Sequence, residues 1–233
     1  MRENQTEQKW LTGGSRVKAF VGHFGSGKTE VAINAACYLR EIGKQVKIVD
    51  LDIVNPFFRT AEQLDMLTAR GIEAIYPPFA RTGVDMPVLG AEVSRAFEAD
   101  GSIAIFDVGG DDSGAAALGR YKPQFEAARG ELYYVVNPYR PRSETREQIL
   151  RLMERIRASA RAEITGIIAN ANLGGYTTRE TIAEGRELIA AVARETGILV
   201  VAECGVEPAL GESGGDWQKF AIRRHLKPEW MEY

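Results

Sequence analysis

A glycine-rich stretch contains the first residues of this sequence whose types and spacing point to a chemistry. Residues 22–29 are GHFGSGKT, which fits the pattern G-x-x-x-x-G-K-[ST] and lies between a β-rich run and a helix-compatible run. Glycines let the main chain fold into a cup of N–H groups, and the start of the following helix adds a partial positive charge, so a phosphate chain fits there. The residues that we expect to bind a nucleoside triphosphate are Gly22, Phe24, Gly25, Ser26, Gly27, Lys28, Thr29 and Glu30.

Two side chains at the end of this loop have specific expected roles. Lys28 should act as a catalytic residue that pairs with the β- and γ-phosphates, and Thr29 should hold Mg²⁺ through its hydroxyl. The competing dinucleotide-binding fingerprint needs glycine at its first, third and sixth positions, but the third position from Gly22 is Phe24. Asp50 would suit a ribose contact in that alternative. The Lys28-Thr29 ending favours phosphate and magnesium instead.

The elements that must position these residues follow from an alternation of short apolar, β-rich runs with helix-compatible segments. This alternation predicts a doubly wound α/β fold, with a mostly parallel sheet of about seven strands and helices on both faces. Several runs are continuously apolar, as in strands that are covered on both faces. The expected strands are Val17–Val21, Gln45–Val49, Ile72–Ile75, Ile103–Phe106, Leu132–Val136, Ile164–Ala169 and Ile198–Ala202.

The length of 233 residues suits one large domain. We expect a nucleotide-binding domain over residues 16–206, preceded by a flexible N-terminus over residues 1–15. The tail, residues 207–233, is Gly-rich and then weakly helical, and we expect it to pack on the domain.

Acidic residues follow two of the expected strands, at the edge of the sheet where ligands bind in such folds. Asp107 stands where a Walker B carboxylate reaches Mg²⁺, directly or through water. Asp50 is a candidate magnesium or switch residue, and Asp52, one full pleat later, is the catalytic candidate that orients the attacking water. The alternative for each is a turn or helix-cap role. Together they predict a magnesium–nucleotide site.

A glycine three residues after Asp107 suggests a nucleotide-dependent switch. The main-chain N–H of Gly110 can approach a γ-phosphate, and hydrolysis would release that contact. Residues 109–120 are therefore the candidate switch segment. Asp111 and Asp112 either assist the metal or form a solvated acidic turn.

The segment after the sixth expected strand indicates which nucleotide base the protein binds. GTPases of this fold use N-K-x-D there, with the aspartate accepting hydrogen bonds from guanine, whereas this chain has Asn170-Ala171-Asn172-Leu173. Asparagine can donate to and accept from the N6/N7 edge of adenine. We therefore expect ATP, with Asn170 and Asn172 at the base.

The motifs GHFGSGKT (22–29), VDLD (49–52), FDVGG (106–110) and IIANAN (167–172) resemble, in this order, the MinD/ParA/CobB-type (CobQ/CobB/MinD/ParA nucleotide-binding) P-loop ATPases over roughly residues 16–205. GHFGSGKTE, DLDIVNPFFR and DVGGDD resemble more closely a bacterial subgroup described only by ATP binding. The resemblance implies ATP and Mg²⁺ as ligands, slow hydrolysis, Asp52 as the hydrolytic aspartate and Asn170 as the residue that reads adenine. The implied partners are ATP or ADP, an unknown protein client and a nucleotide-dependent homodimer.

One position departs from that family. Many partitioning-type members carry a second lysine after the first loop glycine, which reaches the partner subunit's phosphates, and here that position is His23. Histidine is shorter and only partly charged near neutral pH, so the dimer lacks its usual cation. Arg59 and Arg140 are candidate replacements, although a solvated surface role is expected for each.

Two other functions stay open from the sequence. An ATP-dependent small-molecule kinase or ligase needs an acceptor pocket, for which Tyr76–Phe79 and Arg81 are candidate residues. A non-catalytic nucleotide-sensing adaptor would bind ATP without releasing phosphate.

Composition limits the partners and the cellular location that we expect for the protein. A formal net charge of −3 at pH 7 gives no support for a nucleic-acid partner. Cys37 and Cys204 lie in apolar segments and form no metal-binding pair, so we expect buried free thiols and a cytoplasmic location. Met1–Gly14 lacks the apolar core of a signal peptide, and no window of about 18 apolar residues predicts a membrane span.

Overall fold

The computed structural model describes residues 7–52, 61–76, 87–110, 112–211 and 217–225. They form an eight-stranded sheet with the order β3-β2-β4-β1-β5-β6-β7-β8, in which every neighbouring pair is parallel. The predicted α/β fold is confirmed, with one strand more than the seven expected. The strands are β1 (Val17–Val21), β2 (Val46–Leu51), β3 (Glu73–Ile75), β4 (Ile103–Val108), β5 (Glu131–Val136), β6 (Gly166–Ala169), β7 (Val200–Gly205) and β8 (Lys219–Ala221).

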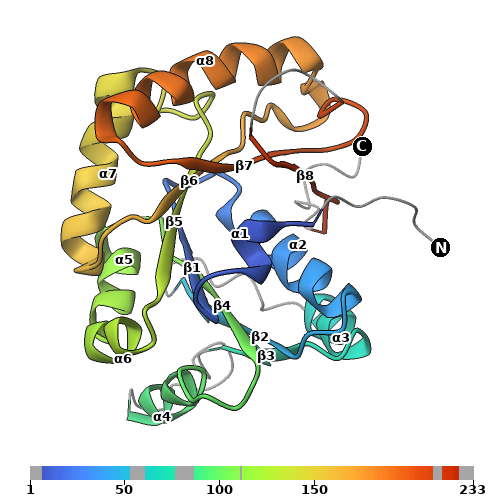
Figure 1. Ribbon diagram of the computed structural model, residues 1–233, viewed down its shortest axis with the longest axis vertical. Helices are drawn as coiled ribbons and strands as arrows, with labels where there is room; N and C mark the ends of the chain where they lie inside the picture. Colours follow the sequence, from blue (N-terminus) through green and yellow to red (C-terminus); the bar gives the residue numbers. More distant parts are fainter. Residues whose placement is uncertain (1–6, 53–60, 77–86, 111, 212–216, 226–233) are drawn as a thin grey trace.

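Helices cover both faces of the sheet (Figure 1). The helices α1, α2 and α3 pack on one face, and α4 to α8 pack on the other. Their bounds are α1 (Lys9–Thr12), α2 (Lys28–Glu41), α3 (Ala61–Ala69), α4 (Pro87–Arg95), α5 (Asp112–Gly119), α6 (Lys122–Ala127), α7 (Arg146–Ala160) and α8 (Arg179–Thr196), with a 3₁₀ turn at Gly174–Tyr176.

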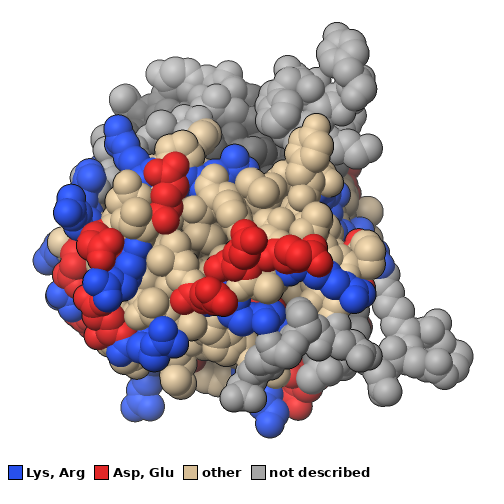
Figure 2. Space-filling view, turned by 90° about the horizontal axis from the view of Figure 1, so that it is seen from above, with Lys and Arg blue, Asp and Glu red and all other residues tan. Residues whose placement is uncertain are grey.

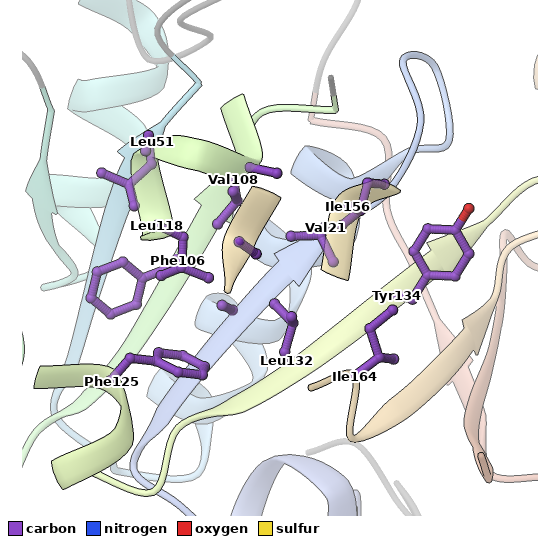
Figure 3. Close-up of a cluster of buried hydrophobic side chains, with 14 of the residues drawn as sticks. Val21, Leu51, Phe106, Val108, Leu118, Phe125, Leu132, Tyr134, Ile156 and Ile164 are labelled. Carbon is purple, nitrogen blue, oxygen red and sulfur yellow. The ribbon is translucent and has the colours of Figure 1, made fainter. Parts of the chain in front are cut away.

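The central strand β1 supplies side chains to both cores. Val17, Ala19 and Val21 belong to the core under α4–α8, whereas Phe20 belongs to the core under α1–α3, because successive side chains of a strand point to opposite faces. Figure 3 shows the first core, where side chains of the sheet meet those of α5, α6 and α7. This packing on two sides fixes the end of β1, from which the glycine-rich loop begins.

Both ends of the described chain differ from the sequence-based expectation. Residues 9–12, expected to be flexible, form α1, and its Trp10 and Leu11 are buried. Residues 219–221, expected to be weakly helical, form β8. The ring of Trp10 packs edge-on against Phe220, with 5.4 Å between the ring centroids. Tertiary packing therefore orders two short segments that have little local preference for structure.

Several expectations from composition can be compared with the structure. Cys37 and Cys204 are free and buried, as predicted. No helix within the described ranges has the length and apolar character needed to cross a bilayer. On the face shown in Figure 2, acidic and basic side chains lie beside one another.

Candidate nucleotide-binding site

The glycine-rich loop joins the end of β1 to the start of α2 at the middle of the sheet, where β1 lies between β4 and β5. Gly25 and Gly27 have φ angles of 75° and 87°, which favour glycine, and Gly27 is the N-cap of α2. The N–H of Ser26 donates to the carbonyl oxygen of His23 at 2.9 Å, which closes the loop. Since the first N–H groups of a helix have no acceptor within it, this loop and helix start can bind an anion.

Lys28 lies in a buried ion pair at the base of the loop. Its Nζ lies 3.1 Å from Oδ2 of Asp52, and both side chains are almost fully buried. Burial lowers the pKa of Lys28, but the carboxylates of Asp107, Asp52 and Asp50 outweigh burial and hold that pKa above its ordinary value. The structure thus brings together the lysine and the three aspartates that the sequence singles out.

Two of these aspartates come from adjacent strands. Asp50 on β2 and Asp107 on β4 are register partners, and both are fully buried. Oδ1 of Asp50 accepts a hydrogen bond from the N–H of Asp52 at 2.9 Å. Burial raises the pKa of Asp107 to about 6, although Lys28 and Thr29 act in the opposite direction. This cluster carries three carboxylates for one ammonium group.

The excess of carboxylates fits a divalent cation that is held partly by the protein and partly by the phosphates of a nucleotide. No group of three or more His, Cys, Asp or Glu side chains within the described ranges is arranged to hold a metal alone. Mg²⁺ in phosphate-transfer sites is commonly held by one or two carboxylates together with phosphate oxygens and water. Thr29, Asp107 and Asp50 could hold it in this way, since Thr29 is buried beside Asp107.

Gly110 lies directly on the main chain of the loop. A Cβ at this position would lie 2.5 Å from the carbonyl oxygen of Gly22 and 2.8 Å from the N atom of Phe24, distances that side chains do not tolerate. Gly109 is equally close to Gly114 of α5, since a Cβ on Gly109 would lie 2.6 Å from its Cα. The segment after β4 therefore connects the loop to the start of α5.

Asn170 contacts the loop from the end of β6. Its Nδ2 donates to the carbonyl oxygen of Ser26 at 2.7 Å, and a Cβ on Gly27 would overlap that Nδ2 atom. Asn172 instead orders its own loop, because its Oδ1 accepts from the N–H of Gly174 at 2.5 Å. One predicted base residue thus lies against the glycine-rich loop, and the other shapes the loop after β6.

A pocket of about 540 Å³ lies beyond the carboxyl ends of β6 and β7. The loop after β6, the start of α8 and the loop after β7 line it, together with one residue from beyond β8. Adjacent strands are about 4.8 Å apart, so β6 and β7 lie about 10–14 Å from β1 across the same edge of the sheet. The pocket is therefore at the same end of the sheet as the glycine-rich loop.

Unpartnered polar atoms gather at this end of the sheet. Within the described residues, four buried side-chain oxygen atoms have no hydrogen-bond partner, and they belong to Ser26, Asp107 and Asn170. Buried polar groups in proteins are almost always hydrogen-bonded. The fold thus leaves acceptors and a hydroxyl for a polar ligand where the sequence predicts a nucleotide.

Two contacts around the loop were not predicted from the sequence. Nε of Arg140 donates to the carbonyl oxygen of Gly25 at 2.9 Å, so Arg140 lies against the loop rather than only in solvent. The carboxylate of Glu30, expected to bind the nucleotide, accepts a hydrogen bond from the N–H of His225. No local pattern could reveal that second contact, because the two residues are 195 positions apart.

The surroundings of His23 disfavour its charged form. Burial lowers its pKa, and the neighbouring charges of Arg142, Arg155 and Lys28 lower it further, which outweighs the opposite effect of a hydrogen bond to Pro141.

Some candidate residues lie outside the described part of the chain. They are Arg59, Asp111, Arg81 and the part of Tyr76–Phe79 that follows Tyr76.

No protein-family model and no curated protein matches this sequence. Solved structures of FtsY do match the fold. Chloroplast FtsY from Physcomitrella patens gives a TM-score of 0.55 at 19% identity, covering 84% of this chain and 60% of that protein. The cell division protein FtsY from Thermotoga maritima gives 0.56 at 21% identity, covering 83% of this chain and 63% of that protein.

These FtsY chains are longer than this one, which spans 60% and 63% of their lengths. At such low identity the likeness shows the fold alone, so membership in the MinD/ParA/CobB-type group stays a prediction. The chain has the α/β fold of the P-loop nucleoside triphosphatases.

Proposed function

We propose that this protein binds ATP with Mg²⁺, hydrolyses it slowly and uses the two nucleotide states to control its association with a protein client. The observation that supports the proposal most directly is the set of unpartnered buried atoms of Ser26, Asp107 and Asn170. Each such atom costs about 1–3 kcal/mol if nothing bonds to it. A bound magnesium–nucleotide complex would supply the missing partners.

The expected roles follow from the positions of the side chains. The loop and the start of α2 would bind the phosphates, with Lys28 on the β- and γ-phosphates. Thr29, Asp107 and Asp50 would hold Mg²⁺, which neutralises phosphate charge when bound. Asp52, whose carboxylate is 3.1 Å from Nζ of Lys28, would orient the attacking water near the γ-phosphate.

The choice of ATP over GTP is supported by residues at the end of β6. Nδ2 of Asn170 already donates to the loop, and its unpartnered Oδ1 can accept a hydrogen bond from the N6 amino group of adenine. The chain lacks the lysine and aspartate of N-K-x-D at this position. The base would enter the pocket beyond β6 and β7.

A switch is supported by the close contact of Gly110 with the loop and of Gly109 with α5. Loss of the γ-phosphate would alter the main chain at residues 109–110, and α5 would follow. Phe24, Leu173 and Tyr176 are exposed apolar side chains on loops at this same edge of the sheet. They offer a surface for a protein client close to the moving segment.

The binding proposal is tested by calorimetry with ATP and Mg²⁺. Lys28→Ala should weaken binding about 10-fold to 100-fold, since hydrogen bonds to charged groups are worth about 1.5–3 kcal/mol each. Lys44→Ala removes an exposed lysine beyond α2 and should leave the affinity unchanged. Unchanged affinity in Lys28→Ala would contradict the proposed site.

Turnover separates the switch from the two other functions. Phosphate release that requires an added metabolite would indicate a kinase or ligase, and a stable ATP complex with no release over hours would indicate an adaptor.

A nucleotide-dependent homodimer would need a cation other than His23. Arg140 is the described candidate, because it already contacts Gly25. Light scattering after size exclusion, without nucleotide, with ADP and with a non-hydrolysable ATP analogue, measures the mass. A dimer that forms with the analogue and is lost in Arg140→Ala would support this arrangement, whereas a monomer in all three states would exclude it.

A further inference from the structure

The segment that follows β8 is tied to the sheet edge next to the pocket. The strand β8 pairs with β7, and the N–H of Ile222 donates to the carbonyl oxygen of Gly205 at 2.8 Å. The buried carboxylate of Glu203 on β7 binds Arg186 at 2.6 Å and also forms an ion pair with Lys219. Figure 1 shows β8 alongside β7 and leading towards α2. The start of the segment is thus fixed by a buried ionic cluster as well as by main-chain pairing.

Helix α2 then holds the next residues by their main chain. Nδ2 of Asn34 donates to the carbonyl oxygen of Arg223 at 2.9 Å, and the N–H of Arg223 donates to Oδ1 of Asn34 at 2.8 Å. The carboxylate of Glu30 accepts from the N–H of His225. Glu30 and Asn34 lie about 3 and 9 Å along the helix from Lys28. The segment is therefore bound to the first two turns of the helix that begins in the glycine-rich loop.

Arg224 lies between the two residues that α2 holds. Its side chain is exposed and lines the pocket beyond β6 and β7 together with Thr177 and Glu207 of the two loops. Within the described part of the chain its guanidinium has no hydrogen-bond or ion-pair partner. Arg179, the other arginine of the pocket, donates instead to the carbonyl oxygen of Pro208. The main chain around Arg224 is fixed while its donors stay available.

We propose that Arg224 contacts the adenine ring of the bound nucleotide, with its guanidinium stacked on the face of the base. This inference rests on the proposed function, which puts the phosphates in the glycine-rich loop and the base in this pocket. A planar guanidinium stacks on aromatic rings, which a flexible ammonium group does less well. The segment from β8 to His225 would thereby close the pocket, and Asn34 and Glu30 would act as positioning residues for Arg224.

The test compares a nucleotide with a phosphate chain that lacks a base. Binding of ATP and of inorganic tripolyphosphate, each with Mg²⁺, is measured by calorimetry on the full chain. Arg224→Ala should weaken ATP binding about 10-fold to 100-fold, the range for loss of one stacking contact, and should leave tripolyphosphate binding unchanged. Arg224→Lys should bind ATP only slightly more tightly than Arg224→Ala. Arg223→Ala is the matched control, since it removes the neighbouring exposed arginine side chain, keeps the main chain and should change neither affinity.

A second measurement detaches the segment after β8 from α2 by removing the side chain of Asn34. Asn34→Ala should weaken ATP binding in the wild-type background but add little to Arg224→Ala, because both changes act through the same contact. Thermal unfolding shows whether Asn34→Ala still folds.

The outcomes distinguish this inference from the proposed function. If the wild-type protein binds ATP and Arg224→Ala binds it equally well, the role of Arg224 is overturned and the nucleotide site stands. Equal losses for ATP and tripolyphosphate would assign Arg224 to phosphate charge and overturn the stacking role. Failure of the wild-type protein to bind ATP would overturn both.

Discussion

Asp50 and Asp107 lie opposite each other in register on β2 and β4, and solvent reaches neither side chain. Like charges that face each other across a sheet destabilise it, and burial increases the cost. Burial raises the pKa of Asp107 to about 6, even with Lys28 and Thr29 nearby. We infer that these two carboxylates lower the free energy of unfolding of the nucleotide-free protein and are kept because they bind the metal.

Replacement of Asp107 by asparagine should therefore stabilise the nucleotide-free protein. We expect Asp107→Asn to raise the free energy of unfolding by about 0.5–2 kcal/mol, because one of two facing carboxylates loses its charge. The same variant should lose the stabilisation that Mg²⁺ and ATP give to the wild-type protein. Denaturant unfolding, with and without Mg²⁺-ATP and with a chelator, measures both effects.

A second aspartate serves as the control for this change. Asp100, at the opposite end of the sheet, forms an ion pair with Lys47 and accepts a hydrogen bond from the N–H of Ser102. Asp100→Asn should therefore lower stability and keep the response to Mg²⁺-ATP. If Asp107→Asn lowered the free energy of unfolding as Asp100→Asn does, the facing carboxylates of Asp50 and Asp107 would not destabilise the nucleotide-free protein, and the inference would be wrong.

Asp52 should affect turnover more than binding. Asp52→Asn keeps the shape of the side chain, and Lys28 retains the nearby carboxylates of Asp50 and Asp107, so we expect ATP affinity within a few-fold of wild type. The rate of phosphate release in a single turnover should fall about 10²–10⁴-fold, as for loss of a group that positions the nucleophile. Asp65→Asn, on the exposed side of α3, should change neither quantity. Full activity in Asp52→Asn would remove Asp52 from the mechanism.

The sequence predicts the interior of the sheet better than its ends. The bounds of β1 match because Val17–Val21 is β-rich and apolar at every position except Lys18, as expected for a strand buried on both faces. The strand β8 could not be predicted, since Lys219–Ala221 has only three residues and depends on pairing with β7 and on the buried charge of Glu203. Helix α1, of four residues, likewise depends on burial of Trp10.

The candidate site likewise has a part that the sequence predicts and a part that it does not. Spacing in the sequence predicts which side chains follow which strand, and parallel strands bring Lys28, Asp50, Asp52 and Asp107 to one edge. The hydrogen bond between Glu30 and His225 depends on how the end of the chain crosses α2, which no local pattern encodes. The pocket that Arg224 lines depends on the same crossing.

Gly110 should tolerate no side chain. The Cβ of Gly110→Ala would collide with the main chain of Gly22 and Phe24, so the loop must move. We expect ATP affinity to fall at least about 10-fold and the free energy of unfolding to fall by about 1–3 kcal/mol. Gly43→Ala is the control, because its φ angle of 82° is unfavourable for alanine but nothing lies within 4 Å of the added Cβ. That variant should lose about 1 kcal/mol of stability and no affinity, as measured by denaturant unfolding and calorimetry.

Asn170 and Asn172 should affect base selection differently. Asn170→Ala removes the unpartnered Oδ1 that we assign to the adenine amino group, so the ratio of ATP to GTP affinity should fall about 5-fold to 10-fold. Asn172→Ala removes the acceptor that orders the loop after β6, so it should weaken both nucleotides alike and keep the ratio. Competition binding with ATP and GTP gives both ratios. A wild-type protein that prefers GTP, or an Asn170→Ala protein with an unchanged ratio, would show that another group reads the base.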